Sequence, residues 1–84
     1  MEKVYSIYDS KSGLYDKPFL ALNSAVIIRE FETMANDPNS TVGKYPEDFT
    51  LFELGEYDNK TGKYKNHDTP KSMGVGIEFI NKQN

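Results

Sequence analysis

The sequence predicts an α+β domain in which one helix packs on a small antiparallel sheet of about four or five strands. One segment, residues 24–35, has the apolar spacing of an amphipathic helix. Runs rich in β-branched and aromatic residues lie on both sides of it, and two of them lead into the same turn pattern. At 84 residues the chain has the length of one domain, which we expect to span residues 1–84.

The turn pattern occurs over residues 8–15, YDSKSGLY, and again over residues 57–64, YDNKTGKY. In each copy the aspartate can accept from a backbone N–H two residues on, and the glycine supplies the positive φ that follows a type I turn. Each copy therefore predicts a hairpin. The repetition has two interpretations: turn chemistry has few solutions, or two lysine-bearing loop tips meet a polar or phosphate-bearing partner.

The first half of the chain predicts a hairpin followed by the helix. Residues 3–8 form the first strand, and residues 14–19 return beside it until Pro18 disrupts the pairing. Asn23 or Ser24 caps the helix, and the segment Asn36-Asp37-Pro38 ends it near Ala35. The apolar stripe that we expect to face the core comprises Ile27, Ile28, Phe31, Met34 and Ala35.

A polar connection over residues 39–48 leads into the second half, where three strands are predicted. In the strand over residues 49–57 we expect Phe52 and Leu54 to face the core, with Glu53 and Gly55 pointing away. Residues 62–65 pair back onto this strand.

The last predicted strand covers residues 73–80 and alternates an apolar face with a face of small and charged residues. Its expected inward face comprises Val75, Ile77 and Phe79. On the other face, Gly74 and Gly76 leave room for a bulge or a closely packed backbone, which we favour over a ligand.

The formal net charge is −3, but the charge is unevenly distributed. Residues 23–58 hold two basic and eight acidic residues, whereas residues 59–84 hold five basic and two acidic ones. The overall acidity argues against a protein that condenses nucleic acid in bulk, because such binding depends on cations that displace counterions. A local basic strip on the second hairpin remains compatible with the negative net charge.

The residue inventory also excludes several classes of site. Without cysteine there is no disulfide, thiolate nucleophile or cysteine metal site. No apolar run approaches the ~20 residues of a membrane span, and the chain start lacks a signal-peptide core, so we expect a soluble protein. The single histidine, His67, lies beside Asp68 in a turn-like segment and is expected to be solvated. We expect no enzyme activity, cofactor or metal, because no catalytic, phosphate-binding or metal-ligand motif is present.

The second hairpin carries the candidate nucleic-acid-binding residues. Tyrosines among lysines are typical of single-strand binders, because bases stack on the rings while lysines follow the phosphates; half-buried sheet tyrosines are the simpler interpretation. The main candidates are Lys60, Lys63, Tyr64, Lys65, Tyr57 and Lys71, and the secondary ones are Lys11, Arg29, Lys44 and Tyr45.

Four segments carry a resemblance to a known family: VYSIYDSK over residues 4–11, NDP over 36–38, PEDFTLFELGEYD over 46–58 and GVGIEF over 74–79. They resemble the small nonstructural protein of gokushovirus-type microviruses, which are single-stranded DNA phages. The resemblance implies a protein made in the cytoplasm of the infected bacterium, absent from the mature capsid and described as DNA-binding. It assigns no role to any residue.

These observations lead us to expect a phage accessory protein that binds single-stranded DNA and assists genome synthesis or packaging. Because so short a chain buries a modest core, we also expect a homo-oligomer that gathers several lysine strips. The alternative is a protein-interaction adaptor that grips a viral replication protein, the procapsid or a host factor through the acidic helix and the surface from Glu47 to Glu56.

Overall fold

The computed structural model describes residues 1–80 and has the α+β fold that the sequence predicts. Residues 81–84, including Lys82 of the basic C-terminal segment, lie outside the described residues. In chain order the elements are β1 (Glu2–Asp9), β2 (Leu14–Tyr15), β3 (Phe19–Ala21), α1 (Ser24–Ala35), α2 (Thr41–Lys44), β4 (Phe49–Asp58), β5 (Lys63–Val75) and the 3-10 helix η1 (Gly76–Phe79).

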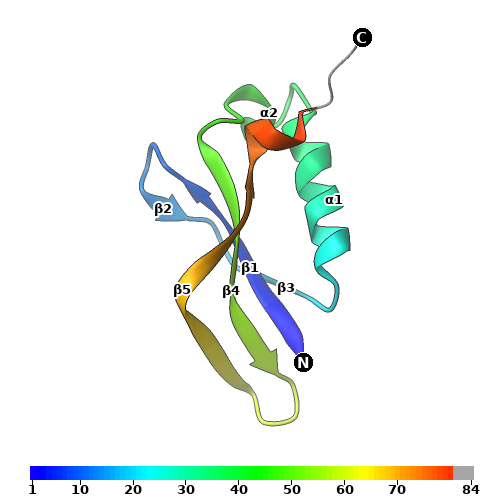
Figure 1. Cartoon of the computed structure of the whole chain (residues 1–84), viewed down its shortest axis with the longest axis vertical. Coiled ribbons are helices and arrows are strands. Elements are labelled where there is room, and N and C mark those ends of the chain that lie inside the picture. The colour runs from blue at the N-terminus through cyan, green and yellow to red at the C-terminus, as the bar shows by residue number, and fades with distance from the viewer. Residues whose placement is uncertain (81–84) are drawn as a thin grey trace.

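The five strands form one antiparallel sheet in the order β2-β1-β4-β5, and β3 pairs with the opposite half of β1 from β2. The predicted return strand is thus split in two: Asp16 still donates its N–H to the Ile7 carbonyl at 2.8 Å, but Lys17 and Pro18 do not pair with β1. Helix α1 lies along one face of the sheet, with α2 and η1 at its C-terminal end (Figure 1). The short helix α2 lies within the segment that the sequence indicated as a polar connection.

The two repeated turns have the same backbone geometry. Asp9 Oδ1 accepts from the backbone N–H of Lys11 at 2.9 Å, and Asp58 Oδ1 accepts from that of Lys60 at 2.9 Å. The two turn glycines have φ of 72° and 75°. The predicted turn chemistry is therefore confirmed.

The two turns nevertheless lie at opposite ends of the sheet. The end of β1 at Asp9 pairs with the start of β4 at Phe49, whereas Glu2 pairs with Tyr57 near the end of β4. One hairpin tip therefore projects from each end of the β1–β4 pair (Figure 1). The 10 residues of β4 separate the two ends by about 30 Å. The repetition reflects local turn chemistry and not one shared surface.

Helix α1 begins and ends as predicted and supplies half of the core. The Asn23 side chain caps it by accepting from the backbone N–H of Ala25 at 2.8 Å. The buried cluster beneath it consists of Tyr5, Ile27, Phe31, Ala35, Val42 and Leu51. Of the predicted stripe, Met34 is 38% exposed, because the sheet meets a narrower face of the helix than the spacing alone suggests.

The predicted orientation of β4 is wrong. Leu51 is fully buried and Glu53 is only 7% exposed, whereas Phe52 is half-buried against Tyr8 and Tyr15 on the other face of the sheet. Gly55, expected to point away, is also buried. A Cβ at this position would lie 2.4 Å from the Lys65 carbonyl oxygen, so only glycine fits there without moving the backbone.

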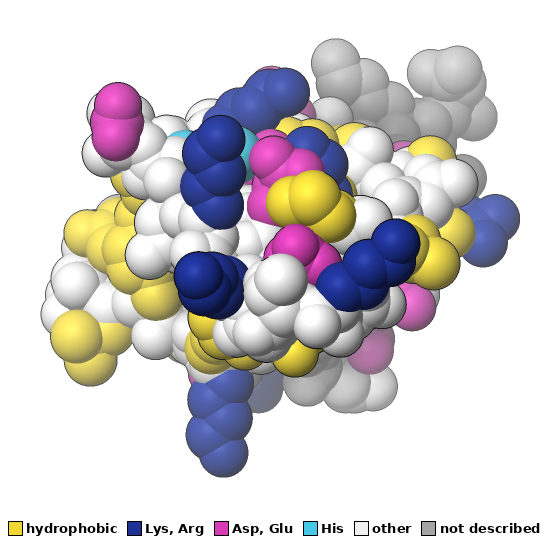
Figure 2. All heavy atoms as spheres, turned by 90° about the horizontal axis from the view of Figure 1, so that it is seen from below, with side chains coloured by type: hydrophobic (Ala, Val, Ile, Leu, Met, Phe, Trp, Pro, Cys, Tyr) yellow, Lys and Arg dark blue, Asp and Glu magenta, His cyan; other side chains and the backbone are white. Residues whose placement is uncertain are grey.

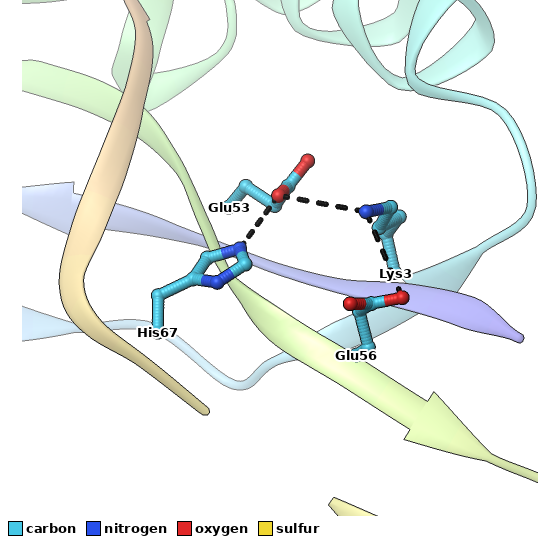
Figure 3. Close-up of polar contacts among 4 residues, drawn as sticks. All are labelled: Lys3, Glu53, Glu56 and His67. Carbon is cyan, nitrogen blue, oxygen red and sulfur yellow. Dashed lines mark hydrogen bonds and ion pairs between the residues drawn. The ribbon is translucent and has the colours of Figure 1, made fainter. Parts of the chain in front are cut away.

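The inward orientation of Glu53 depends on a polar cluster that joins three strands (Figure 3). Its carboxylate Oε2 lies 2.6 Å from His67 Nε2 on β5 and 4.0 Å from Lys3 Nζ on β1. Lys3 also contacts Glu56 Oε2 at 3.8 Å. The expectation that His67 is a solvated loop residue is therefore wrong, because it lies in β5 and is paired with a buried carboxylate.

The C-terminal prediction is also wrong in part, because β5 ends at Val75 and residues 76–79 form η1. The backbone N–H of Ile77 donates to the Pro46 carbonyl at 3.0 Å, and a Cβ on Gly76 would lie 2.6 Å from the same oxygen. The close approach of the backbones holds η1 against the connection, so the packing interpretation of Gly76 is confirmed. Phe79 packs edge-on to Phe31 at 5.5 Å, while Ile77 is half exposed.

The sheet face away from α1 carries a second aromatic group. Tyr8, Tyr15 and Phe52 contact one another, with ring centroids 4.8–6.1 Å apart. Seen from the hairpin end, hydrophobic side chains gather on the side where Figure 1 places β2 (Figure 2). Most of the six tyrosines thus lie in strands of the sheet, as their amphipathic character predicts.

Replacing His67 by alanine is expected to lower the free energy of unfolding by about 2–3 kcal/mol, because the buried Glu53 carboxylate would lose its shortest polar contact. The double variant His67→Ala, Glu53→Leu is expected to recover part of the loss, since no buried charge remains. Urea denaturation followed by circular dichroism measures both. Thr69→Ala, an exposed change in the same segment, is the control, and equal losses for H67A and T69A would contradict the prediction.

The Tyr5 hydroxyl predicts a loss of stability at alkaline pH. It is buried and has no hydrogen-bond partner of good geometry among residues 1–80. Burial raises its pKa, the charge of Glu53 raises the pKa further, and the nearby Ser24 side chain offsets part of the rise. The stabilisation that depends on neutral Tyr5 is complete below the unfolded pKa near 10 and is lost as pH rises through the folded pKa.

Tyr5→Phe is therefore expected to leave stability at pH 7 within about 1 kcal/mol and to make the decline above pH 10 shallower. Unfolding free energies at pH 7 and at several values above pH 9 measure this. Tyr45→Phe, at an exposed position, controls for the other tyrosines. A large loss at pH 7 would mean that the hydroxyl makes a stabilising hydrogen bond.

Candidate nucleic-acid interface

The structure divides the ten predicted residues between several places. The hairpin of β4 and β5 brings together Tyr57, Lys60, Lys63, Tyr64 and Lys65. Lys71 lies farther along β5, opposite Glu53. Arg29 is exposed on α1, and the other three lie at the far end of the sheet, with Lys11 in the first turn and Lys44 and Tyr45 at the end of α2.

The tyrosines of the second hairpin form one stacking surface. Tyr57 and Tyr64 are directly paired across the strands, and their ring centroids lie 4.8 Å apart. Tyr64 is 61% exposed and Tyr57 supports it from one side. An exposed ring held by a neighbouring ring offers a flat apolar surface on which a base can stack.

The lysines lie on the other face of the same ribbon. Side chains alternate along a strand, so Lys63 and Lys65 point away from the face that carries Tyr64. The hairpin is two strands wide and β5 is the edge strand, so both faces are reached from that edge. Lys60 lies at the tip, where the Asp58 side chain fixes the backbone of the turn.

Carboxylates alternate with these lysines. Lys63 pairs across the strands with Asp58, and Lys65 with Glu56, so this face resembles a charge ladder more than a continuous basic strip. Figure 2 shows this intermixing of Lys or Arg side chains with Asp or Glu side chains. Within residues 1–80, however, no ion pair within 4 Å includes Lys60, Lys63 or Lys65, and Glu56 is held by Lys3.

Lys11 and Tyr45 lie at the other end of the molecule, in a combination that the sequence did not predict. They line a groove of about 660 Å³ together with Asp9, Thr41, Glu47, Asp48 and Phe49. Carboxylates outnumber the lysine there, so phosphates would be repelled. The sequence signal for this groove is weak, because its walls come from segments about 35 residues apart.

Two further findings concern other kinds of site. In the described part of the chain, no group of three or more His, Cys, Asp or Glu residues could hold a metal ion. No helix of residues 1–80 is long and apolar enough to cross a membrane.

Comparison with known proteins identifies the family. Neither the search of curated proteins nor that of solved structures found a match. The family model described as "Phage ORF5 protein" matches residues 2–79, which is nearly the whole chain and includes every element described above. The chain therefore belongs to the Phage ORF5 protein family.

Proposed function

We propose that this phage protein binds single-stranded DNA through the hairpin of β4 and β5, and so assists genome synthesis or packaging. The observation that carries the proposal is an exposed tyrosine, Tyr64, backed by Tyr57 and flanked by lysines that have no ion-pair partner within the described residues. Stacking tolerates any base, and lysines follow the phosphates, so this combination suits binding without sequence preference.

The proposed path of the strand follows the free edge of β5. Bases stack on Tyr64 on one face, while the phosphates reach Lys60 at the tip and Lys63 and Lys65 on the other face. One hairpin contacts few nucleotides, so stable binding requires several copies side by side. A homo-oligomer is therefore part of the proposal.

The resemblance to the small nonstructural protein of gokushovirus-type microviruses supports this proposal, because their genome is single-stranded DNA. On this basis the protein acts in the cytoplasm of the infected bacterium, without catalysis or a cofactor. Its phage origin rests on the family match.

The alternative is an adaptor that binds a viral replication protein, the procapsid or a host factor through the acidic helix and the surface from Glu47 to Glu56. The Glu47 to Glu56 part of this interface is less well supported. Glu53 is buried and Glu56 is paired with Lys3, so neither is free for a partner. Glu47 and Asp48 remain available at the groove.

The triple variant Lys60→Ala, Lys63→Ala, Lys65→Ala is expected to weaken binding of a fluorescent single-stranded oligonucleotide and to reduce its dependence on salt. Each lost phosphate contact lowers the log–log salt slope by about 0.7, so the slope should fall by about 2. Fluorescence anisotropy across a salt series measures it.

The matched control for this triple variant is Lys11→Ala, Lys17→Ala, Lys44→Ala, which removes the same charge. Of these, the secondary candidates Lys11 and Lys44 lie at the other end of the sheet, where the groove carboxylates repel phosphates, so we expect neither to contact DNA. Equal effects of the two triples would show that net charge alone governs binding. No binding by the natural protein at low salt would refute direct DNA binding.

Tyr64→Ala is expected to cost about 1–3 kcal/mol of affinity for the same oligonucleotide, because a base loses its stacking surface. Tyr64→Phe keeps the ring and should retain most of the affinity. Tyr45→Ala removes an equally exposed ring at the other end and should have no effect. If Y64A binds as tightly as the natural protein, the stacking role is excluded.

A further inference from the structure

The groove at the end opposite the second hairpin has the form of a separate binding site. One wall is the first turn and the end of β1, and the other is the connection from α2 to β4. A second hollow, lined by residues of β2 such as Leu14 and Tyr15, shares Asp9, Thr41 and Phe49 with it. The two hollows therefore adjoin each other beside the first hairpin.

Backbone hydrogen bonds hold the walls of this groove in place. The N–H of Ser10 in the first turn donates to the Asp48 carbonyl at 2.9 Å and so joins the two walls. The N–H of Asp48 donates to the Tyr45 carbonyl at 2.9 Å and closes the turn that carries Glu47. The groove is formed before any ligand arrives, which lowers the entropy cost of binding.

The charged groups of the groove are mostly acidic. Asp9, Asp16, Glu47 and Asp48 line the two hollows against a single lysine, Lys11. Asp9 and Asp16 each accept one backbone N–H through Oδ1. In the described region the carboxylates of Glu47 and Asp48 accept no hydrogen bond and form no ion pair, so they are free to bind a cation.

Apolar surface lies next to these carboxylates. Tyr45 is 55% exposed, Phe49 is a half-buried lining residue of both hollows, and Leu14 of β2 is exposed. A carboxylate beside an aromatic ring matches the arginine side chain, whose guanidinium pairs with the acid while its stem packs on the ring. Lysine fits the same surface as a point charge.

We propose that this groove binds a basic, arginine- or lysine-bearing segment of a protein partner. Its volume accommodates a few side chains of an extended segment, and its charge excludes the phosphate backbone of a nucleic acid. The site lies at the other end of the sheet from the DNA-binding hairpin, in a molecule 48 Å long, so the two ligands do not compete. The inference does not rest on the proposed DNA binding.

The test uses a fluorescein-labelled nine-residue peptide in which three arginines alternate with leucine and glycine, and the same peptide with citrulline in place of arginine. We expect the arginine peptide to bind more tightly and to shift the amide resonances of residues 9–16 and 41–49. The double variant Glu47→Gln, Asp48→Asn should weaken it about tenfold.

The matched control is Glu30→Gln, Glu32→Gln, which removes the same charge from α1 outside the groove and should leave peptide affinity unchanged. Equal affinity for the two peptides, equal weakening by the two double variants, or amide shifts centred on the second hairpin would overturn the proposal. A single-stranded oligonucleotide that shifts the amide resonances of residues 9–16 and 41–49 would also overturn the proposal.

The outcomes separate this site from the hairpin. The variant of Lys60, Lys63 and Lys65 should bind the arginine peptide normally, and the variant of Glu47 and Asp48 should bind single-stranded DNA at least as well as the natural protein. A result that refutes binding at one site therefore leaves the proposal for the other site unaffected.

Discussion

The buried carboxylate of Glu53 is the constraint on which the path of the second half of the chain depends. A charged group with so little exposure needs close partners, and His67 reaches it only because β5 carries residues 67–70 opposite the single residue Leu54. This excursion divides β5 into a half that continues toward η1 and a half that belongs to the hairpin. The contact between Glu53 and His67 thus fixes the position on the sheet from which the hairpin extends.

This division gives the molecule two chemically different ends. One end is the ribbon of β4 and β5, whose side chains include an exposed tyrosine and lysines that form no ion pair within residues 1–80. The other end combines the first turn, α2 and the start of β4 into an acidic groove with apolar walls. The strands β1 and β4 hold the two ends apart, so a ligand at one end leaves the other end open (Figure 1).

The sequence predicts what depends on neighbouring residues and fails where distant ones decide. The turns and the start of α1 follow from the sequence because Asp9, Asp58 and Asn23 act on backbone groups two residues away. The face of β4 was inverted because apolar alternation favours Phe52, whereas the real orientation requires His67 from another strand. For the same reason Gly76 did not reveal a 3-10 helix, since the Pro46 backbone that it meets lies 30 residues earlier.

The acidity of the chain is compatible with the proposed DNA binding because a bound phosphate interacts mainly with the charges that lie near it. Near the hairpin, Glu53 is paired with His67 and Glu56 with Lys3, so both carboxylates are partly neutralised. The groove carboxylates lie about 30 Å away along the strands, several times the Debye length of about 8 Å at physiological salt. A phosphate at the edge of β5 therefore experiences mainly the charges of the hairpin, where the lysines alternate with carboxylates such as Asp58. The net charge of −3 describes the whole molecule better than either end.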